Sequence, residues 1–225
     1  MFWNGNKRLI VYTATVNRPE HPLYIGPPPR SHVDYLRFTK DMLIDLPPEF
    51  STRWPKLLPH EMLVTDYSIW IDSNISLMID PWEVVDMLDG KDFAVLPHCW
   101  GHDCIYQEAS NCFTFRKDYV VAIERQMHRY LAEGYPNHNG LYWGKMLVRK
   151  HTEAVKEFNE AWWHELVRGS HRDQLSLPYV LHKTKLPFTV IQRPSPQIFF
   201  WWVGKHLGYK SPEVLHPKTH FLGEV

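Results

Sequence analysis

The chain has 225 residues, of which 44% are apolar and 22% charged, as in an ordinary globular protein with one sizeable core. Its 25 basic residues balance its 25 acidic ones, so no bulk charge draws it toward nucleic acid or an anionic membrane. The longest apolar run, IFFWWV at 198–203, is far shorter than the roughly 20 residues of a membrane-spanning helix. We therefore expect a single domain over residues 1–225, with no nucleic-acid partner and no transmembrane segment.

The cysteines and the N-terminal residues indicate a cellular compartment. Cys99, Cys104 and Cys112 are an odd number within one short segment, which argues against a disulfide framework and favours a reducing compartment. The apolar stretch near the N-terminus has no small-residue cleavage site and is more typical of a first strand than of a signal peptide. A cytoplasmic location is the resulting expectation.

The first elements are strands separated by loops. Residues 8–16 are rich in β-branched side chains and predict a buried strand. The proline-rich segment 17–32 predicts an extended loop, because proline has no backbone N–H to donate. Residues 34–38 predict a short second strand, and 62–72 contain another.

Helices and strands then alternate. Asp80 and Pro81 predict a helix start, since aspartate caps helices and proline is tolerated at the first position, and Gly90 predicts its end. The remaining expected elements are a strand at 92–97, a helix at 117–133 stopped by Gly134, a strand at 145–149, a helix at 152–169, a helix from 173 to about 183 bent at Pro178, and a strand at 188–192. This alternation predicts an α/β sheet with helices on both faces.

The segment DYSIWIDSN, residues 66–74, ends a buried strand with polar side chains. Asp72-Ser73-Asn74 is good turn chemistry, and a turn is one interpretation. In an extended segment the side chains of Asp72 and Asn74 would project to the same side and could share one hard cation such as Mg²⁺ or Mn²⁺. In α/β sheets, ligands bind beyond the carboxyl ends of the strands, where both residues are expected.

Two further segments carry candidate polar groups. In RDQLSLPYV, residues 172–180, Asp173 lies where a helix begins. Its negative charge either interacts favourably with the helix dipole or lies at a sugar carbon or an acceptor hydroxyl, with Gln174 as a hydrogen-bonding partner. In the segment 137–151, Gly140 and Gly144 either shape a loop or let the backbone approach a ligand closely.

Several familiar sites have no motif in this chain. GxGxxG, GxxxxGK[ST], HExxH and GxSxG are all missing, so dinucleotide, P-loop, zincin and serine-hydrolase sites lack support. The segment PHCWGHDC offers four potential zinc ligands in His98, Cys99, His102 and Cys104, although their spacing is not that of a paired zinc motif. A zinc-stabilised interaction domain is therefore one hypothesis.

Taken in order, four segments resemble the glycosyltransferase-like family long filed as a domain of unknown function, which includes plant cell-wall and mucilage proteins and bacterial relatives. These segments are DYSIWIDSNISL, PHCWGHDCIYQEA, GLYWGKMLVRKH and WWHELVRGSHRDQLSLPYVL. The resemblance covers the chain from residue 9 to about 183. It implies a GT-A-like, Rossmann-like fold, with a mixed, mostly parallel sheet flanked by helices, and a more distant similarity to glycogenin-like enzymes.

The resemblance implies a nucleoside diphosphate sugar as donor, with UDP the expected nucleotide, and a divalent ion, Mn²⁺ or Mg²⁺, beside the diphosphate. Asp72 and Asn74 would hold the metal and the diphosphate, although Asn74 replaces the second aspartate of the family's DxD motif. His206, His216 or His220 would complete the coordination, with His206 favoured. The nucleotide-binding residues implied are Thr13, Ala14, Thr15, Asp41 and Lys56.

On the acceptor side the resemblance implies a glycan or another hydroxyl compound. Asp173, with Gln174, would be the general base of an inverting enzyme or would stabilise the oxocarbenium-like centre of a retaining one. The implied pocket residues are Gly140, Leu141, Trp143 and Arg172. A glycosyltransferase is thus the leading hypothesis, and a catalytically degenerate carbohydrate-binding module, motivated by Asn74, is the alternative.

Overall fold

The computed structural model describes residues 7–16, 20–99 and 101–202. A six-stranded sheet forms its centre, in the order β2-β1-β3-β6-β5-β7, and a two-stranded sheet pairs β4 with β8. The strands are β1 (Leu9–Ala14), β2 (Asp34–Phe38), β3 (Tyr67–Ile71), β4 (Ile75–Leu77), β5 (Phe93–Pro97), β6 (Tyr142–Lys150), β7 (Phe188–Val190) and β8 (Phe199–Trp201). The α-helices are α1 (Pro48–Ser51), α2 (Arg53–Leu57), α3 (Pro81–Asp86), α4 (Ile105–Thr114), α5 (Val120–Ala132), α6 (Glu153–Arg168) and α7 (Asp173–Thr184). Short 3-10 turns lie at Lys40–Met42, Pro59–Glu61 and Ser195–Gln197.

One strand of the large sheet runs against the others. β1 pairs in parallel with β2 and β3, and β5 pairs in parallel with β7. β6 is inserted antiparallel between β3 and β5. The expectation of a mixed, mostly parallel sheet flanked by helices is confirmed. The inversion brings the start of β6 to the edge where β1 and β3 end.

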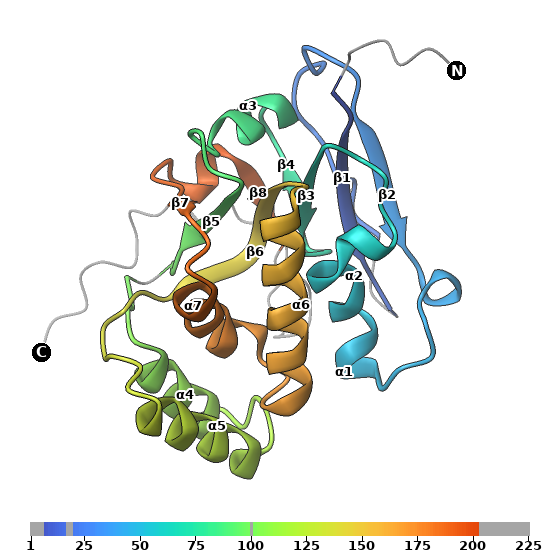
Figure 1. Cartoon of the computed structure of the whole chain (residues 1–225). Helices are drawn as coiled ribbons and strands as arrows, with labels where there is room; N and C mark the ends of the chain where they lie inside the picture. Colours follow the sequence, from blue (N-terminus) through green and yellow to red (C-terminus); the bar gives the residue numbers. More distant parts are fainter. Residues whose placement is uncertain (1–6, 17–19, 100, 203–225) are drawn as a thin grey trace, which may run out of the picture.

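Each face of the sheet buries its own apolar cluster, because alternate side chains of a strand point to opposite faces. On one face Tyr12, Trp70 and Leu147 pack with Phe158 and Trp162 of α6, and with side chains of α5 and α7. On the other face lie Val11, Ile71 and Val148 of the sheet, the helix α3, and side chains of β4 and β8. Figure 1 shows α6 and α7 in front of the sheet and α3 at its upper edge.

Most expected elements form with bounds close to the predicted ones, and the helix at α7 does contain Pro178. One expectation needs correction. The helix that begins at Pro81 ends at Asp86, not at Gly90, because Leu88 and Asp89 donate to the carbonyls three residues back and tighten the chain into turns. Of the two interpretations of Asp72-Ser73-Asn74, the structure shows the turn: Ile75 N–H donates to the Asp72 carbonyl at 3.0 Å, which closes a turn between β3 and β4.

The structure also contains elements without a predicted counterpart. They are α1, α2, α4, β4 and β8. Among the described residues, none of the helices combines the length and the apolar character needed to span a bilayer.

Asp80 caps α3 as the sequence predicts. Its Oδ1 accepts the Trp82 N–H at 3.0 Å and its Oδ2 accepts the Arg30 N–H at 3.0 Å, which ties the proline-rich loop to the helix. We expect Asp80→Ala to lower the free energy of unfolding by about 1–2 kcal/mol, as for other N-caps. Denaturant unfolding measures this, and Asp80→Asn, which keeps one acceptor oxygen, should lose less. Equal losses in the two variants would contradict the assignment.

Candidate functional site

A cavity of about 590 Å³ opens where β1 and β3 end. Its walls come from the segments after β1 and β3, from α2 and the residue before it, from the start of β6, and from the start of α7. The lining residues are Ala14, Thr15, Val16, Thr52, Arg53, Lys56, Trp70, Asp72, Ser73, Asn74, Trp143, Gly144, Lys145, Arg172, Asp173 and Gln174. Its size and its place at the carboxyl ends of parallel strands are typical of ligand sites in α/β proteins.

The structure brings together ten of the residues that the sequence nominated for the site. They are Ala14, Thr15, Lys56, Asp72, Asn74, Trp143, Gly144, Arg172, Asp173 and Gln174. Thr13 is buried inside β1, and Asp41 is exposed in a 3-10 turn. Leu141 packs in the apolar core, and Gly140 adopts a left-handed backbone with φ +89°. These four do not line the cavity, and His206 lies outside the described residues.

A buried ion pair crosses the cavity. The Lys56 ammonium lies 2.5 Å from Asp173 Oδ2 and 3.6 Å from Asp72 Oδ1. Lys56 is 6% and Asp173 9% exposed, so water screens their attraction weakly. Asp173 also belongs to the first turn of α7, where the helix dipole favours a negative charge. The pair connects α2 with α7.

The pair determines the ionisation of Asp173. Burial by itself would raise the pKa of this carboxyl, but Lys56, Arg53 and Arg172 outweigh burial and hold the pKa well below its usual value of 3.8. Asp173 is therefore a carboxylate at all physiological pH values. A general base works best with a pKa near the operating pH, so this environment favours charge stabilisation over proton abstraction.

Two neighbours fix the position of the pair. A Cβ added to Gly144 would lie 3.1 Å from Lys56 Nζ and 3.4 Å from Asp173 Oδ2, so the backbone of β6 approaches both charged groups closely. The turn before α7 is held by Asp118, whose Oδ2 accepts the His171 N–H at 2.9 Å and the hydroxyl of Ser170. Gly144 was one of two glycines that the sequence suggested for close approach to a ligand.

One carboxylate oxygen of Asp72 lies near both the Trp70 indole and the Lys56 ammonium. Oδ1 accepts the Trp70 indole N–H at 3.1 Å, and the Asp72 side chain is 33% exposed to the cavity. Asn74 lines the same cavity, so one carboxylate and one amide oxygen face it. This donor set fits a hard divalent cation that takes its remaining ligands from water and substrate oxygens, as Mg²⁺ commonly does.

The sequence did not single out Arg53 or Lys145, which add positive charge to the wall. Lys145 Nζ lies 4.1 Å from the ring centroid of Trp201 and 5.0 Å from that of Trp143, an aromatic contact that orients its ammonium. At the other end the Thr15 hydroxyl is buried and makes no hydrogen bond within the described part of the chain. Neither Arg53 nor Lys145 belongs to a local motif in the sequence, so only the tertiary structure shows them at the cavity.

A separate cluster lies after β5. The ligand atoms of His98, His102 and Glu108 are within 4.8 Å of one another, and the rings of the two histidines stack at 5.0 Å. The carboxylate of Glu108 also lies 3.5 Å from Lys117 Nζ and accepts the Cys112 thiol at 3.6 Å. None of the three cysteines forms a disulfide bond within the described residues. The group assembled here contains Glu108 in place of Cys99 and Cys104, so the zinc hypothesis stays a prediction with a different ligand set.

Comparisons with known proteins place this chain in a family. Residues 48–198 match the family model described as TOD1/MUCI70, glycosyltransferase-like domain. A probable hexosyltransferase MUCI70 from Arabidopsis thaliana is 28% identical over 141 residues, which cover 57% of this chain and 24% of that protein. The chain therefore spans about a quarter of the length of this relative. Mouse xyloside xylosyltransferase 1, in its apo form, aligns with a TM-score of 0.41 and 10% identity over 70% of this chain and 62% of that chain.

The ion pair predicts a pH-dependent stability. Replacing Asp173 by Asn leaves the Lys56 ammonium buried beside an uncharged group, so we expect a loss of about 3–5 kcal/mol of unfolding free energy at pH 7. Because the folded-state pKa lies below the unfolded value, this contribution is present above about pH 4 and is lost as the pH falls through the folded pKa.

Denaturant unfolding of the wild type and Asp173→Asn from pH 7 to pH 3 measures both effects. The two stabilities should approach each other below pH 4. A difference that stays constant over this range would show that the carboxylate charge does not contribute to folding.

Proposed function

Because the chain belongs to the TOD1/MUCI70 glycosyltransferase-like family, we propose that it transfers a sugar from a nucleoside diphosphate sugar to a hydroxyl group of a glycan or another acceptor. The observation that carries this proposal is the cavity at the ends of β1 and β3, where cationic side chains surround two carboxylates. Such a site can bind a diphosphate on its cationic wall and place the sugar carbon beside Asp173.

The charge of the cavity supports an anionic donor. Two carboxylates line it, Asp72 and Asp173, and four cationic side chains outnumber them. The cations are Arg53, Lys56, Lys145 and Arg172. The excess of two positive charges is opposite in sign to a diphosphate diester, which carries one negative charge on each phosphate. Arginine and lysine donors to phosphate oxygens form charge-assisted hydrogen bonds, which are stronger than neutral ones.

The segment that follows β1 is proposed to bind the nucleotide. Ala14 and Thr15 line the cavity at the end of this parallel strand, next to the turn that contains Asp72. The buried Thr15 hydroxyl is a donor and an acceptor available to a base or a ribose. UDP remains the proposed nucleotide on the strength of the family resemblance alone.

Asp72 and Asn74 are proposed to hold a divalent ion, Mn²⁺ or Mg²⁺. When bound, such an ion neutralises the leaving diphosphate as a Lewis acid. The chain's own part is to orient the ligands: Trp70 donates to Asp72 Oδ1, and the turn at residues 72–75 fixes the backbone. A bound ion would share Asp72 with Lys56, whose ammonium lies 3.6 Å from Oδ1 and would be repelled by the ion.

Asp173 is proposed to act on the sugar as a fixed negative charge. Its low pKa suits stabilisation of positive charge at the anomeric carbon and makes it a poor acceptor for a hydroxyl proton. Gln174 donates to the Tyr142 carbonyl at 3.2 Å, which orients this side chain at the rim of the cavity. This arrangement favours the retaining role of Asp173 over that of an inverting base.

The first test is thermal stability with UDP-, GDP-, CMP- and dTDP-sugars, each with and without Mn²⁺. A ligand that binds only the folded state raises the melting temperature, so we expect a rise with one nucleotide that is larger with Mn²⁺. Asp72→Ala should abolish the metal-dependent part of the rise and lower transfer at least tenfold. Asp45→Ala, at an exposed position outside the cavity, should change neither.

Two other results would contradict parts of this proposal. A rise with glycans but with no nucleotide sugar would replace the enzyme by a carbohydrate-binding module on the same scaffold. Full transfer activity in Asp72→Ala would overturn the metal role and leave the diphosphate to the cationic side chains.

A further inference from the structure

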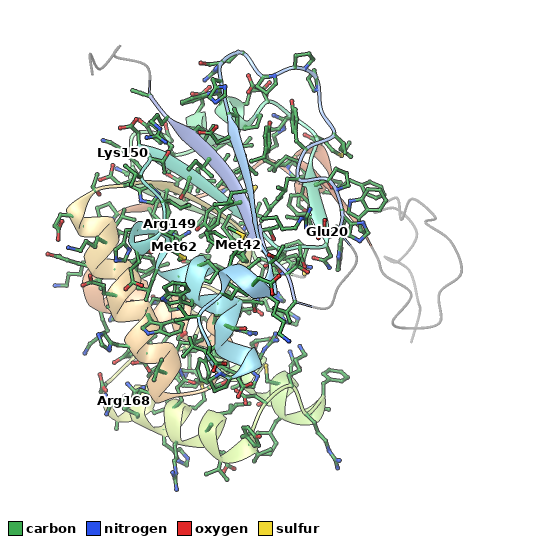
Figure 2. All side chains as sticks on the ribbon, turned by 90° about the vertical axis from the view of Figure 1, so that its right-hand side faces the viewer. Glu20, Met42, Met62, Arg149, Lys150 and Arg168 are labelled. Carbon is green, nitrogen blue, oxygen red and sulfur yellow. The ribbon has the colours of Figure 1, made fainter. Side chains whose placement is uncertain are left out.

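Arg149 is a completely buried cation beneath the candidate site. It is 0% exposed and projects from β6 on the face that packs against α6, like Leu147 two residues before it. In Figure 2 Arg149 lies toward the interior of the molecule, whereas the adjacent Lys150 lies nearer its edge. Burying a guanidinium costs several kcal/mol unless partners compensate it.

The partners of Arg149 are all uncharged. Nε donates to Asn159 Oδ1 of α6 at 3.1 Å, Nη1 to the Tyr12 hydroxyl at 3.4 Å, and Nη2 to the Lys56 carbonyl at 3.0 Å. Burial raises the pKa of Tyr12 to about 12, against the opposing effects of Arg149 and Ser68, so this phenol is neutral and supplies no counter-charge. No ion pair in the described part of the chain includes Arg149.

The bond to the Lys56 carbonyl connects this cation with the cavity. α2 has only five residues, so its last carbonyls have no partner within the helix. Arg149 satisfies the carbonyl of the same residue whose ammonium contacts Asp173 and Asp72. The buried Arg149 guanidinium thus holds the backbone of Lys56 at the end of α2.

Two aromatic side chains, Tyr12 and Trp70, lie between the Arg149 guanidinium and the Lys56 ammonium. Tyr12 packs edge-on against Trp70 with ring centroids 5.3 Å apart, and the Lys56 ammonium lies 5.6 Å from the Trp70 centroid. Trp70 also donates to Asp72. One packed column therefore runs from Arg149 through Tyr12 and Trp70 to the floor of the cavity.

We propose that Arg149 is a positioning residue: through the Lys56 carbonyl it holds the Lys56 ammonium between Asp173 and Asp72. Arg149 touches neither donor nor acceptor, and its effect reaches them through Lys56. That it also aids donor binding rests on the proposed function; that it positions the ion pair does not.

The test is a double-mutant cycle between Arg149→Met and Asp173→Asn, read as unfolding equilibrium constants at pH 7. Met fills similar volume without charge or donors. If Arg149 positions Lys56, the ion pair is already weakened in Arg149→Met, so Asp173→Asn should change the equilibrium constant at least threefold less there than in the wild type. Coupling of this size is common for residues that share a network.

Arg129→Met is the matched control. Arg129 is a half-buried arginine that pairs with Glu165 and Glu133 and is not among the residues that line the cavity. The same chemical change there should lower stability and leave the effect of Asp173→Asn unchanged. If Arg149→Met does not fold, the cycle is run with Arg149→Lys, which keeps the charge and cannot reach all three acceptors.

Coupling below threefold would overturn the positioning role, whatever the protein binds. If the wild type binds a nucleotide sugar, Arg149→Met should also raise its dissociation constant at least fivefold, and Arg129→Met should not. Coupling without any nucleotide binding by the wild type would contradict the proposed function and leave the positioning role standing.

Discussion

The candidate site depends on a buried contact between an ammonium and a carboxylate, that of Lys56 with Asp173. Such a pair adds little to stability over an apolar replacement, yet losing one partner is costly because the other stays buried and charged. The contact therefore fixes α2 against α7 more than it strengthens the fold. Gly144 leaves room for the contact, because any side chain at that position would approach both charged groups. Arg149 stabilises the contact from the protein core by donating to the Lys56 carbonyl. Three separate chain segments, α2, β6 and α7, thus meet at one electrostatic contact.

The antiparallel strand β6 is what lets those segments meet. In a wholly parallel sheet its first residues would lie at the opposite edge, away from the ends of β1 and β3. Because β6 runs against its neighbours, Trp143, Gly144 and Lys145 reach the cavity, while Arg149 near the other end of the strand lies deep in the core. Net charge over the whole chain is zero, and the topology still gathers an excess of positive charge at one edge of the sheet.

Local patterns were enough to predict much of this. β-branched and apolar runs identified β1, β3 and β5, helical spacing identified α5 and α6, and polar residues at element ends identified Asp72 and Asp173. The sequence could not show that Lys56 pairs with Asp173, since the two are distant in the chain and joined only by tertiary packing. α2 contains Pro55 and spans five residues, too few for a helical period. Arg149 is the last residue of a strand that the sequence predicts, and only the structure shows its side chain completely buried.

The structure of Asp72-Ser73-Asn74 is compatible with both interpretations of the sequence, a turn and a polar ligand site. The segment forms a tight turn at the end of β3, and this turn places the oxygen-bearing side chains of Asp72 and Asn74 at the cavity. In the proposed function, the uncharged Asn74 affects the charge balance of the cavity. A second carboxylate there would lower the positive excess of the cavity. An amide keeps an oxygen ligand and leaves the excess intact, so the fixed cations of the chain share with any bound ion the task of neutralising a diphosphate. In the proposed function Lys56 would set the balance between the two, since Asp72 attracts this ammonium and a divalent ion would repel it. Such a site would bind the ion more weakly than two aspartates would, and its own cationic side chains would bind the anionic donor.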